Sequence, residues 1–189
     1  FFLYLGILIK KQIKVMSNLK VGTYKYASTE IKGYSNSQIA KNETNDCFVR
    51  AVASATDVNY DTAHQYVKEV FGREDKKGTE FTNMVMMKLE EDGMEIGNKN
   101  VKVRVLSTNE ITNRYKLHGE VIKRKKTVKS FIKDYAKGTY IVGVSGHAFT
   151  IKDGVLVDNV GEEFRPTRKV QSAFRIDAPK QTSNQLTLF

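Results

Sequence analysis

The hydrophobic periodicity of this chain changes along its length, and that change limits the folds it can form. Between residues 46 and 138, apolar residues recur mainly at helical spacing, as in Phe48, Ala51, Val52 and Ala55. After residue 138, short β-rich runs alternate with turn residues. Helices followed by strands, with no internal repeat, predict an α+β fold.

Capping and turn residues set the limits of the expected elements. Asp46 is a suitable N-cap before Cys47, Asp61 can cap a second helix, and Thr127 can cap a fourth. An Asp153-Gly154 turn should join two strands as an antiparallel hairpin. The polar stretch 107–119 gives no clear signal. The expected helices are 47–56, 61–71, 82–92 and 127–138, and the expected strands are 21–26, 101–106, 139–144, 147–151, 155–158 and 169–176.

The chain has 189 residues, which is enough for one domain with its own core. We expect a polar lead-in over 1–41, a single domain over 42–176 and a polar tail over 177–189. The first nine residues are apolar, but about 20 are needed to span a bilayer, so no membrane partner is expected. Because Met16 resembles an ordinary start, we interpret residues 1–15 as upstream translated sequence.

A formal net charge of +10 favours encounters with anionic partners. Four consecutive basic residues occupy 123–126, and Lys129, Lys133 and Lys137 follow. We interpret this run as a solvated helix face with its preceding loop, in preference to a phosphate-binding patch. No aromatic residue interleaves with the run to stack on bases. Weak proximity to nucleic acid is therefore the most that the charge predicts.

Cys47 is the only cysteine, so the fold has no internal disulfide and a reducing compartment, the cytoplasm, is expected. Its place at the start of a predicted helix would favour the thiolate, which is the nucleophilic form. A lone cysteine near the start of an apolar helix is, however, more often a small buried side chain. A catalytic interpretation needs a partner base.

His147 is the best candidate for that base. It begins a strand directly after Gly146, which leaves room for a substrate and gives the imidazole a rigid support. His64 is better explained as a residue of an amphipathic helix, and His118 as a surface loop residue. These isolated histidines and the single cysteine lack metal-ligand spacing, so neither a metal nor another cofactor is expected.

The third member of a triad would accept a hydrogen bond from His147 and orient its ring. Asp158 and Asn159 end the strand that the predicted hairpin pairs with the His147 strand, and Asp158 is the preferred candidate. An oxyanion hole would combine the backbone N–H of Cys47 with a side-chain amide. Asn42 and Asn45 are the available amides, and the sequence does not choose between them.

Several motifs in this order resemble a known family. They are Asn45-Asp46-Cys47-Phe48-Val49-Arg50-Ala51, Phe71-Gly72-Arg73, Lys77-Gly78-Thr79, Gly146-His147, Asp153-Gly154 and Asp158. The set resembles small phage-type and bacterial members of the papain-like cysteine peptidase superfamily. The resemblance implies Cys47 as nucleophile, His147 as base and Asp158 as orienting residue, with a helical half packed against an antiparallel sheet. Papain-like enzymes usually carry a Gln upstream of the nucleophile, where this chain has Lys41 and Asn42.

We therefore expect a thiol-dependent amide or peptide hydrolase in a bacterial host cytoplasm, acting on a protein or peptide. The resemblance also covers acyltransferases and deamidases. The last five residues, Gln185-Leu186-Thr187-Leu188-Phe189, resemble the peptide that docks bacterial proteins on the DNA polymerase sliding clamp. Leu186, Leu188 and Phe189 would supply the apolar part of that contact and Gln185 the polar part. The alternative function is thus a noncatalytic, clamp-binding interaction protein.

Overall fold

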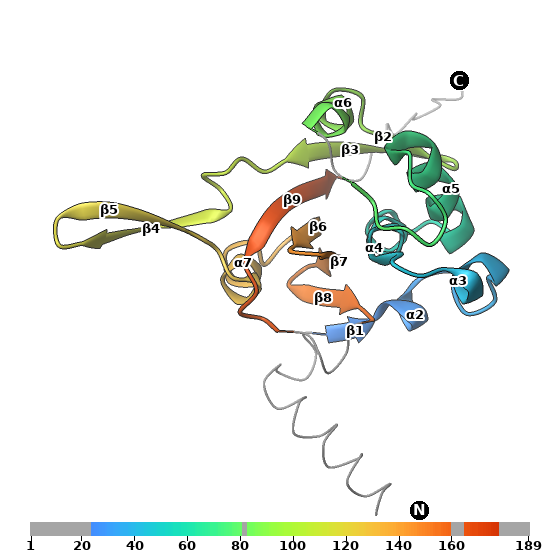
Figure 1. Cartoon of the computed structure of the whole chain (residues 1–189), viewed down its shortest axis with the longest axis horizontal. Coiled ribbons are helices and arrows are strands. Elements are labelled where there is room, and N and C mark those ends of the chain that lie inside the picture. Colours follow the sequence, from blue (N-terminus) through green and yellow to red (C-terminus); the bar gives the residue numbers. More distant parts are fainter. Residues whose placement is uncertain (1–23, 81–82, 160–164, 178–189) are drawn as a thin grey trace, which may run out of the picture.

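The computed structural model describes residues 24–80, 83–159 and 165–177. Within them, a seven-stranded sheet lies beside a group of helices, and a separate two-stranded hairpin projects from the body (Figure 1). The prediction of a mixed helix and sheet fold is confirmed. The helices are α2 (Ala27–Glu30), α3 (Gln38–Asn42), α4 (Cys47–Thr56), α5 (Tyr60–Phe71), α6 (Asn83–Asp92) and α7 (Val128–Asp134).

The order of the large sheet differs from the order of its strands in the chain. The strands are β1 (Tyr24–Tyr26), β2 (Met94–Ile96), β3 (Lys99–Val105), β6 (Thr139–Val144), β7 (His147–Lys152), β8 (Val155–Asp158) and β9 (Val170–Asp177). They are arranged as β1-β8-β7-β6-β9-β3-β2, and only the β1–β8 pair is parallel. The strands β6, β7 and β8, which the sequence placed well, form consecutive antiparallel pairs.

Both faces of this sheet are covered, which explains the dense apolar runs in its central strands. Successive side chains of a strand point to opposite faces. In β6, Ile141 joins the apolar cluster beneath α4 and α5, while Val142 joins a second cluster around Phe131 of α7. No helix among the described residues is long and apolar enough to cross a membrane.

Helix α4 is held against the centre of the sheet by packing and by one buried polar contact. Its residues Val49 and Val52 are fully buried. The hydroxyl of Thr150 on β7 donates to the backbone carbonyl of Ala51 at 2.7 Å, away from solvent. Because this bond joins the middle of α4 to the middle of β7, it limits how far the two elements can slide past each other.

Two predicted helix caps are corrected. The α5 cap is Asn59, whose side chain accepts from the N–H of Asp61, because Asn59 takes the extended conformation that an N-cap needs. Asp46 does occupy the N-cap position of α4, but its side chain makes no capping bond. Thr127 caps α7 as predicted, accepting from the N–H of Ser130.

The largest difference from the sequence prediction lies between residues 107 and 126. The ambiguous stretch and part of the basic run form strands β4 (Thr112–Leu117) and β5 (Glu120–Lys125), which pair as a hairpin. The interpretation of 123–125 as a loop before a helix is therefore wrong. The turn is His118-Gly119, both with positive φ, and this two-residue geometry matches the twist of a hairpin. Helix α7 also ends at Asp134, earlier than predicted.

Part of the expected lead-in is built into the core. Strand β1 extends the sheet alongside β8, and Ala27 and Ile31 are buried in the main apolar cluster. The expected 1–15 segment and the clamp-binding residues Gln185, Leu186, Leu188 and Phe189 lie outside the described residues, so these predictions stay untested.

Candidate active site

The three side chains that the sequence selected meet where α4 begins beside the sheet. Cys47 is the first residue of α4, His147 is the first residue of β7, and Asp158 is the last residue of β8. The His147 Nε2 atom lies 2.6 Å from Asp158 Oδ2. Since Nε2 is engaged by Asp158, Nδ1 is the ring nitrogen left to interact with the Cys47 thiol, whose pKa His147 helps to lower.

Two tight turns bring His147 and Asp158 together. The β7–β8 turn, Asp153-Gly154, has positive φ at both residues, as the predicted hairpin turn requires. The β6–β7 turn contains Gly146 at φ +69° with open space around its Cα, so this residue suits both the strained backbone and an accessible site. The guanidinium of Arg168 donates to the carbonyl of Ser145 in the same turn.

Asp158 is well placed to orient the imidazole. Only 3% of its side chain is exposed, compared with 12% for His147. Its second carboxylate oxygen, Oδ1, accepts a 2.7 Å bond from the backbone N–H of Asn159. The alternative third residue, Asn159, is engaged elsewhere, because its Oδ1 accepts from the N–H of Ser28 at 2.8 Å.

The electrostatics favour a thiolate and an imidazolium. Burial opposes charge on both groups, but hydrogen bonds from His147 and from the backbone N–H of Ala148 bring the net pKa of Cys47 below its ordinary value. Burial would likewise lower the pKa of His147, yet the bonds to Asp158 and Cys47 raise it to about 9. Both shifts favour proton transfer from sulfur to imidazole.

The side chain of Asp46 leaves the first turn of α4 uncapped. One of its oxygens accepts from the Tyr60 hydroxyl at 2.8 Å, and the other lies 3.0 Å from Arg50 Nε. The first backbone bond of α4 runs from the N–H of Arg50 to the carbonyl of Asp46. The N–H of Cys47 therefore precedes the bonded part of the helix, where it is suited to stabilise an oxyanion.

The two candidate oxyanion amides both bind backbone carbonyls. The Nδ2 group of Asn42 donates to Gln38 within α3, and that of Asn45 donates to Lys76. Each NH₂ group has a second hydrogen, but both side chains are exposed and fixed by these contacts. The structure thus gathers Cys47, His147 and Asp158, and it gives no comparable contact to Asn42 or Asn45.

A buried ionic network supports the loop before Cys47, and the sequence gave no warning of it. Arg73, whose side chain is fully buried, bonds Glu43 at 2.6 Å and the carbonyl of Thr44 at 3.2 Å. His64 Nε2 lies 3.0 Å from Glu43 and 3.1 Å from Arg73. Burial opposes ionisation of Glu43, but the bonds from Arg73, His64 and Lys76 lower its pKa to about 2.

The same network contains a set of possible metal ligands. Atoms of Glu43, His64 and Asp75 lie within 4.8 Å of one another. The guanidinium of Arg73 already supplies a positive charge to two of them, and a metal ion would have to displace this buried cation. We therefore assign this cluster a structural role, in agreement with the interpretation of His64 as a helix residue.

Comparisons with protein-family models, with curated proteins and with solved structures found no match to this chain. The functional argument consequently rests on the geometry of the site.

Proposed function

We propose that this protein is a thiol-dependent hydrolase of amide or thioester bonds, with a Cys47–His147–Asp158 triad. The observation that carries the proposal is the 2.6 Å contact between His147 and Asp158, beside a cysteine whose pKa His147 helps to lower. A structural cysteine needs neither a base nor an oriented base. A nucleophilic cysteine needs both.

The chemistry follows from the positions of these groups. The Cys47 thiolate adds to the carbonyl carbon, and the negative charge that forms on oxygen is stabilised by the N–H of Cys47. The imidazolium of His147 gives its proton to the leaving amine or thiol as the bond to that group breaks, which leaves a thioester on Cys47. His147 then takes a proton from water as the water attacks the thioester, the carbon–sulfur bond breaks, and the acid product leaves with the Cys47 thiolate restored.

Within this proposal, Asp158 is a positioning residue. Its carboxylate holds the ring so that Nδ1 faces sulfur, and its negative charge stabilises the imidazolium. The class of acceptor stays open, because an amine in place of water would give acyl transfer and a primary amide substrate would give deamidation. The superfamily resemblance noted from the sequence supports a papain-like arrangement and a protein or peptide substrate.

The test uses a peptide thioester as substrate and intact-mass spectrometry as readout. We expect native protein to hydrolyse the thioester with transient gain of one acyl group on Cys47, and Cys47→Ala to fall to the background rate. Urea-unfolded protein is the control, because it retains the thiol but loses the triad. Equal hydrolysis by native and unfolded chains, or by Cys47→Ala, would contradict the proposal.

A further inference from the structure

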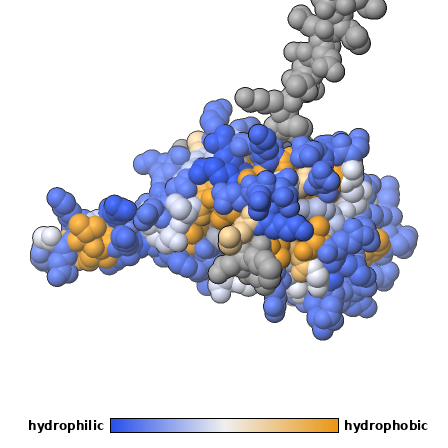
Figure 2. All heavy atoms as spheres, turned by 90° about the horizontal axis from the view of Figure 1, so that it is seen from above, coloured by the Kyte–Doolittle hydropathy of each residue, from blue (hydrophilic) through white to orange (hydrophobic). Residues whose placement is uncertain are grey.

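The β4–β5 hairpin projects from the body and exposes most of its side chains (Figure 2). Tyr115, Leu117 and Val121 are 50%, 48% and 58% exposed, which is unusual for large apolar residues. The hairpin has no role in the triad, which lies at the start of α4. An exposed two-stranded ribbon of this kind is marginally stable by itself, and a partner that covered it would stabilise it.

The strand register gathers positive charge on one face of this ribbon. Residues that pair directly point to the same face, and the pairs Arg114–Lys123 and Lys116–Val121 therefore share a face with Lys125. The opposite face carries Arg124 and the Tyr115–Ile122 pair. Both strands thus contribute cations to the first face, while Tyr115 lies on the opposite face beside Arg124.

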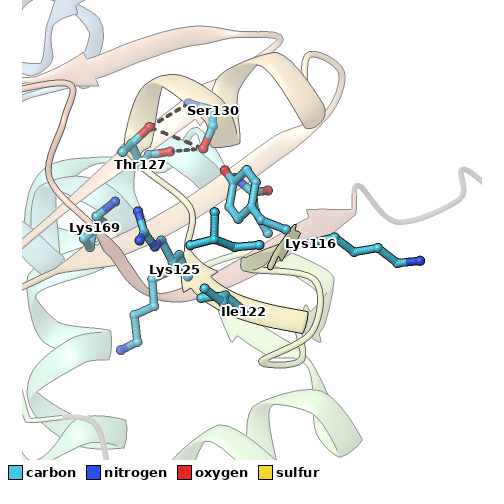
Figure 3. Close-up of a pocket in the computed structure, with 10 residues that line it drawn as sticks. Lys116, Ile122, Lys125, Thr127, Ser130 and Lys169 are labelled. Carbon is cyan, nitrogen blue, oxygen red and sulfur yellow. Dashed lines mark hydrogen bonds between the residues drawn. The ribbon is translucent and has the colours of Figure 1, made fainter. Parts of the chain in front are cut away.

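The basic surface continues from the ribbon into a hollow of about 420 Å³ at its base. Lys116, Arg124, Lys125 and Lys169 line it together with Tyr115. In Figure 3, Lys116 and Lys169 lie on opposite sides of this hollow, the Lys116 side chain extends outward, and Thr127 and Ser130 lie at the start of α7. Positive side chains therefore contribute to a concave surface, which is suited to an anionic partner.

Little of this charge is neutralised by acids in the described part of the chain. Glu120 is the only acidic residue between 112 and 125. Among the described ion pairs, none involves Arg114, Lys116 or Lys123. The cations of the exposed face are consequently available to an external anion.

We propose that the β4–β5 hairpin binds duplex DNA by entering the major groove. That groove is about 12 Å wide and admits a two-stranded β-ribbon, whereas the major groove of duplex RNA is too narrow for side chains to read. Cations on both strands of the ribbon can contact phosphates on the two groove walls. The basic run is therefore part of the binding surface, and the face that carries Arg114, Lys116, Lys123 and Lys125 supplies most of its charge.

The tip of the ribbon argues against a membrane as the anionic partner. A hairpin that inserts into lipid needs an apolar tip, but this turn is His118-Gly119 followed by the carboxylate of Glu120. In a groove, by contrast, cations along the sides of the ribbon make the contacts.

The test measures fluorescence anisotropy of a labelled 20-base-pair DNA duplex with the full-length chain across a range of salt concentrations. Arg114→Gln, Lys116→Gln and Lys123→Gln are combined in one variant. We expect this triple variant to bind at least about tenfold more weakly than wild type, because each lost phosphate contact also removes released counterions. The slope of log K against log salt should become shallower by about 2.7.

The matched control removes the same charge elsewhere by combining Lys32→Gln, Lys88→Gln and Lys102→Gln, all at exposed positions. We expect this control to bind within about twofold of wild type. Equal losses in both triple variants, tighter binding to a single strand or duplex RNA, or binding only to anionic vesicles would overturn the proposal. The Cys47 site is unchanged in every variant, so the result is independent of the proposed hydrolase.

Discussion

The charge of the proposed catalytic pair depends on one carboxylate. Asp158 is almost fully buried and has bonds to His147 and to the Asn159 N–H, so its orientation is fixed from two directions. A negative group that touches the imidazole stabilises its protonated form, and this contact helps raise the pKa of His147 to about 9. The thiolate of Cys47 depends in turn on that positive ring.

Replacing Asp158 by Asn should therefore lower the pKa of His147 well below 9. The amide keeps the shape of the side chain but removes the charge that favours imidazolium. The measurement is an NMR titration of the histidine ring protons, with His147→Gln used to assign the His147 signal. Asp153→Asn is the matched control, since Asp153 accepts from the Gly138 N–H in the turn and should leave the His147 titration in place. An unchanged pKa in Asp158→Asn would contradict the assigned role.

Local sequence patterns made the three triad candidates predictable. Cys47 follows a helix-capping position, His147 follows a glycine, and the Asp153-Gly154 turn fixes the pairing that returns Asp158 to His147. The Ala148 N–H and the buried Arg73 network were not predicted. Their roles depend on contacts between residues that are far apart in the chain, such as Arg73 and Glu43. The residues next to Arg73 and Glu43 in the sequence give no sign that the two side chains meet.

Between elements, the contact of α4 with β7 determines whether thiol and imidazole stay together. The two residues begin their respective elements, so any slide of the helix along the strand separates them. Val49 and Val52 supply apolar packing at this contact, and the buried bond from Thr150 to Ala51 gives it direction. The position of the site is thus a consequence of ordinary helix–sheet packing.

Thr150→Val should lower the free energy of unfolding by about 1 kcal/mol, because a nearly isosteric change removes one buried hydrogen bond. It should also slow alkylation of Cys47 near neutral pH, since α4 is less firmly held. Chemical denaturation and intact-mass labelling measure the two effects. Thr139→Val, at the half-buried start of β6, is the control and should change neither. No loss of stability in Thr150→Val would show that the bond does not anchor the helix.

Turn chemistry explains which elements the sequence could and could not place. The Asp153-Gly154 hairpin was predicted because Asp-Gly is a familiar two-residue turn. His118-Gly119 makes the same geometry in β4–β5, but its strands are mostly exposed on both faces and lack the clear alternation that a buried face imposes. The absence of a buried face is also what marks this hairpin as an external surface.

At the scale of the molecule, one sheet joins two apolar clusters and positions the site at its rim. The mixed fold and its later strands were predictable, because β6 and β7 must be apolar on both faces. The strand order was not. Strand β1 pairs with β8, which lies more than 100 residues later in the chain, and β9 lies between β6 and β3. The hydrophobic periodicity of the sequence does not indicate which distant strands pair.

The molecule also separates two surfaces with different chemistry. The proposed triad lies where α4 begins beside the sheet, whereas the cationic hairpin extends away from the helices α3 to α5 (Figure 1). A hydrolase and a DNA-binding ribbon on one chain would bring thiol chemistry close to nucleic-acid-bound substrates. Each proposal has its own test, and neither depends on the other.

The most direct test of the central claim is the rate of Cys47 alkylation by iodoacetamide between pH 5 and 9, followed by intact mass on the native chain. An ordinary thiol has a pKa near 8.5. We predict rapid labelling of wild type well below that pH, and a shift of the labelling midpoint to higher pH in His147→Ala, with the urea-unfolded chain as the ordinary-thiol reference. Slow labelling of native protein below pH 8, unaffected by His147→Ala, would show that Cys47 is a core residue and would contradict the account.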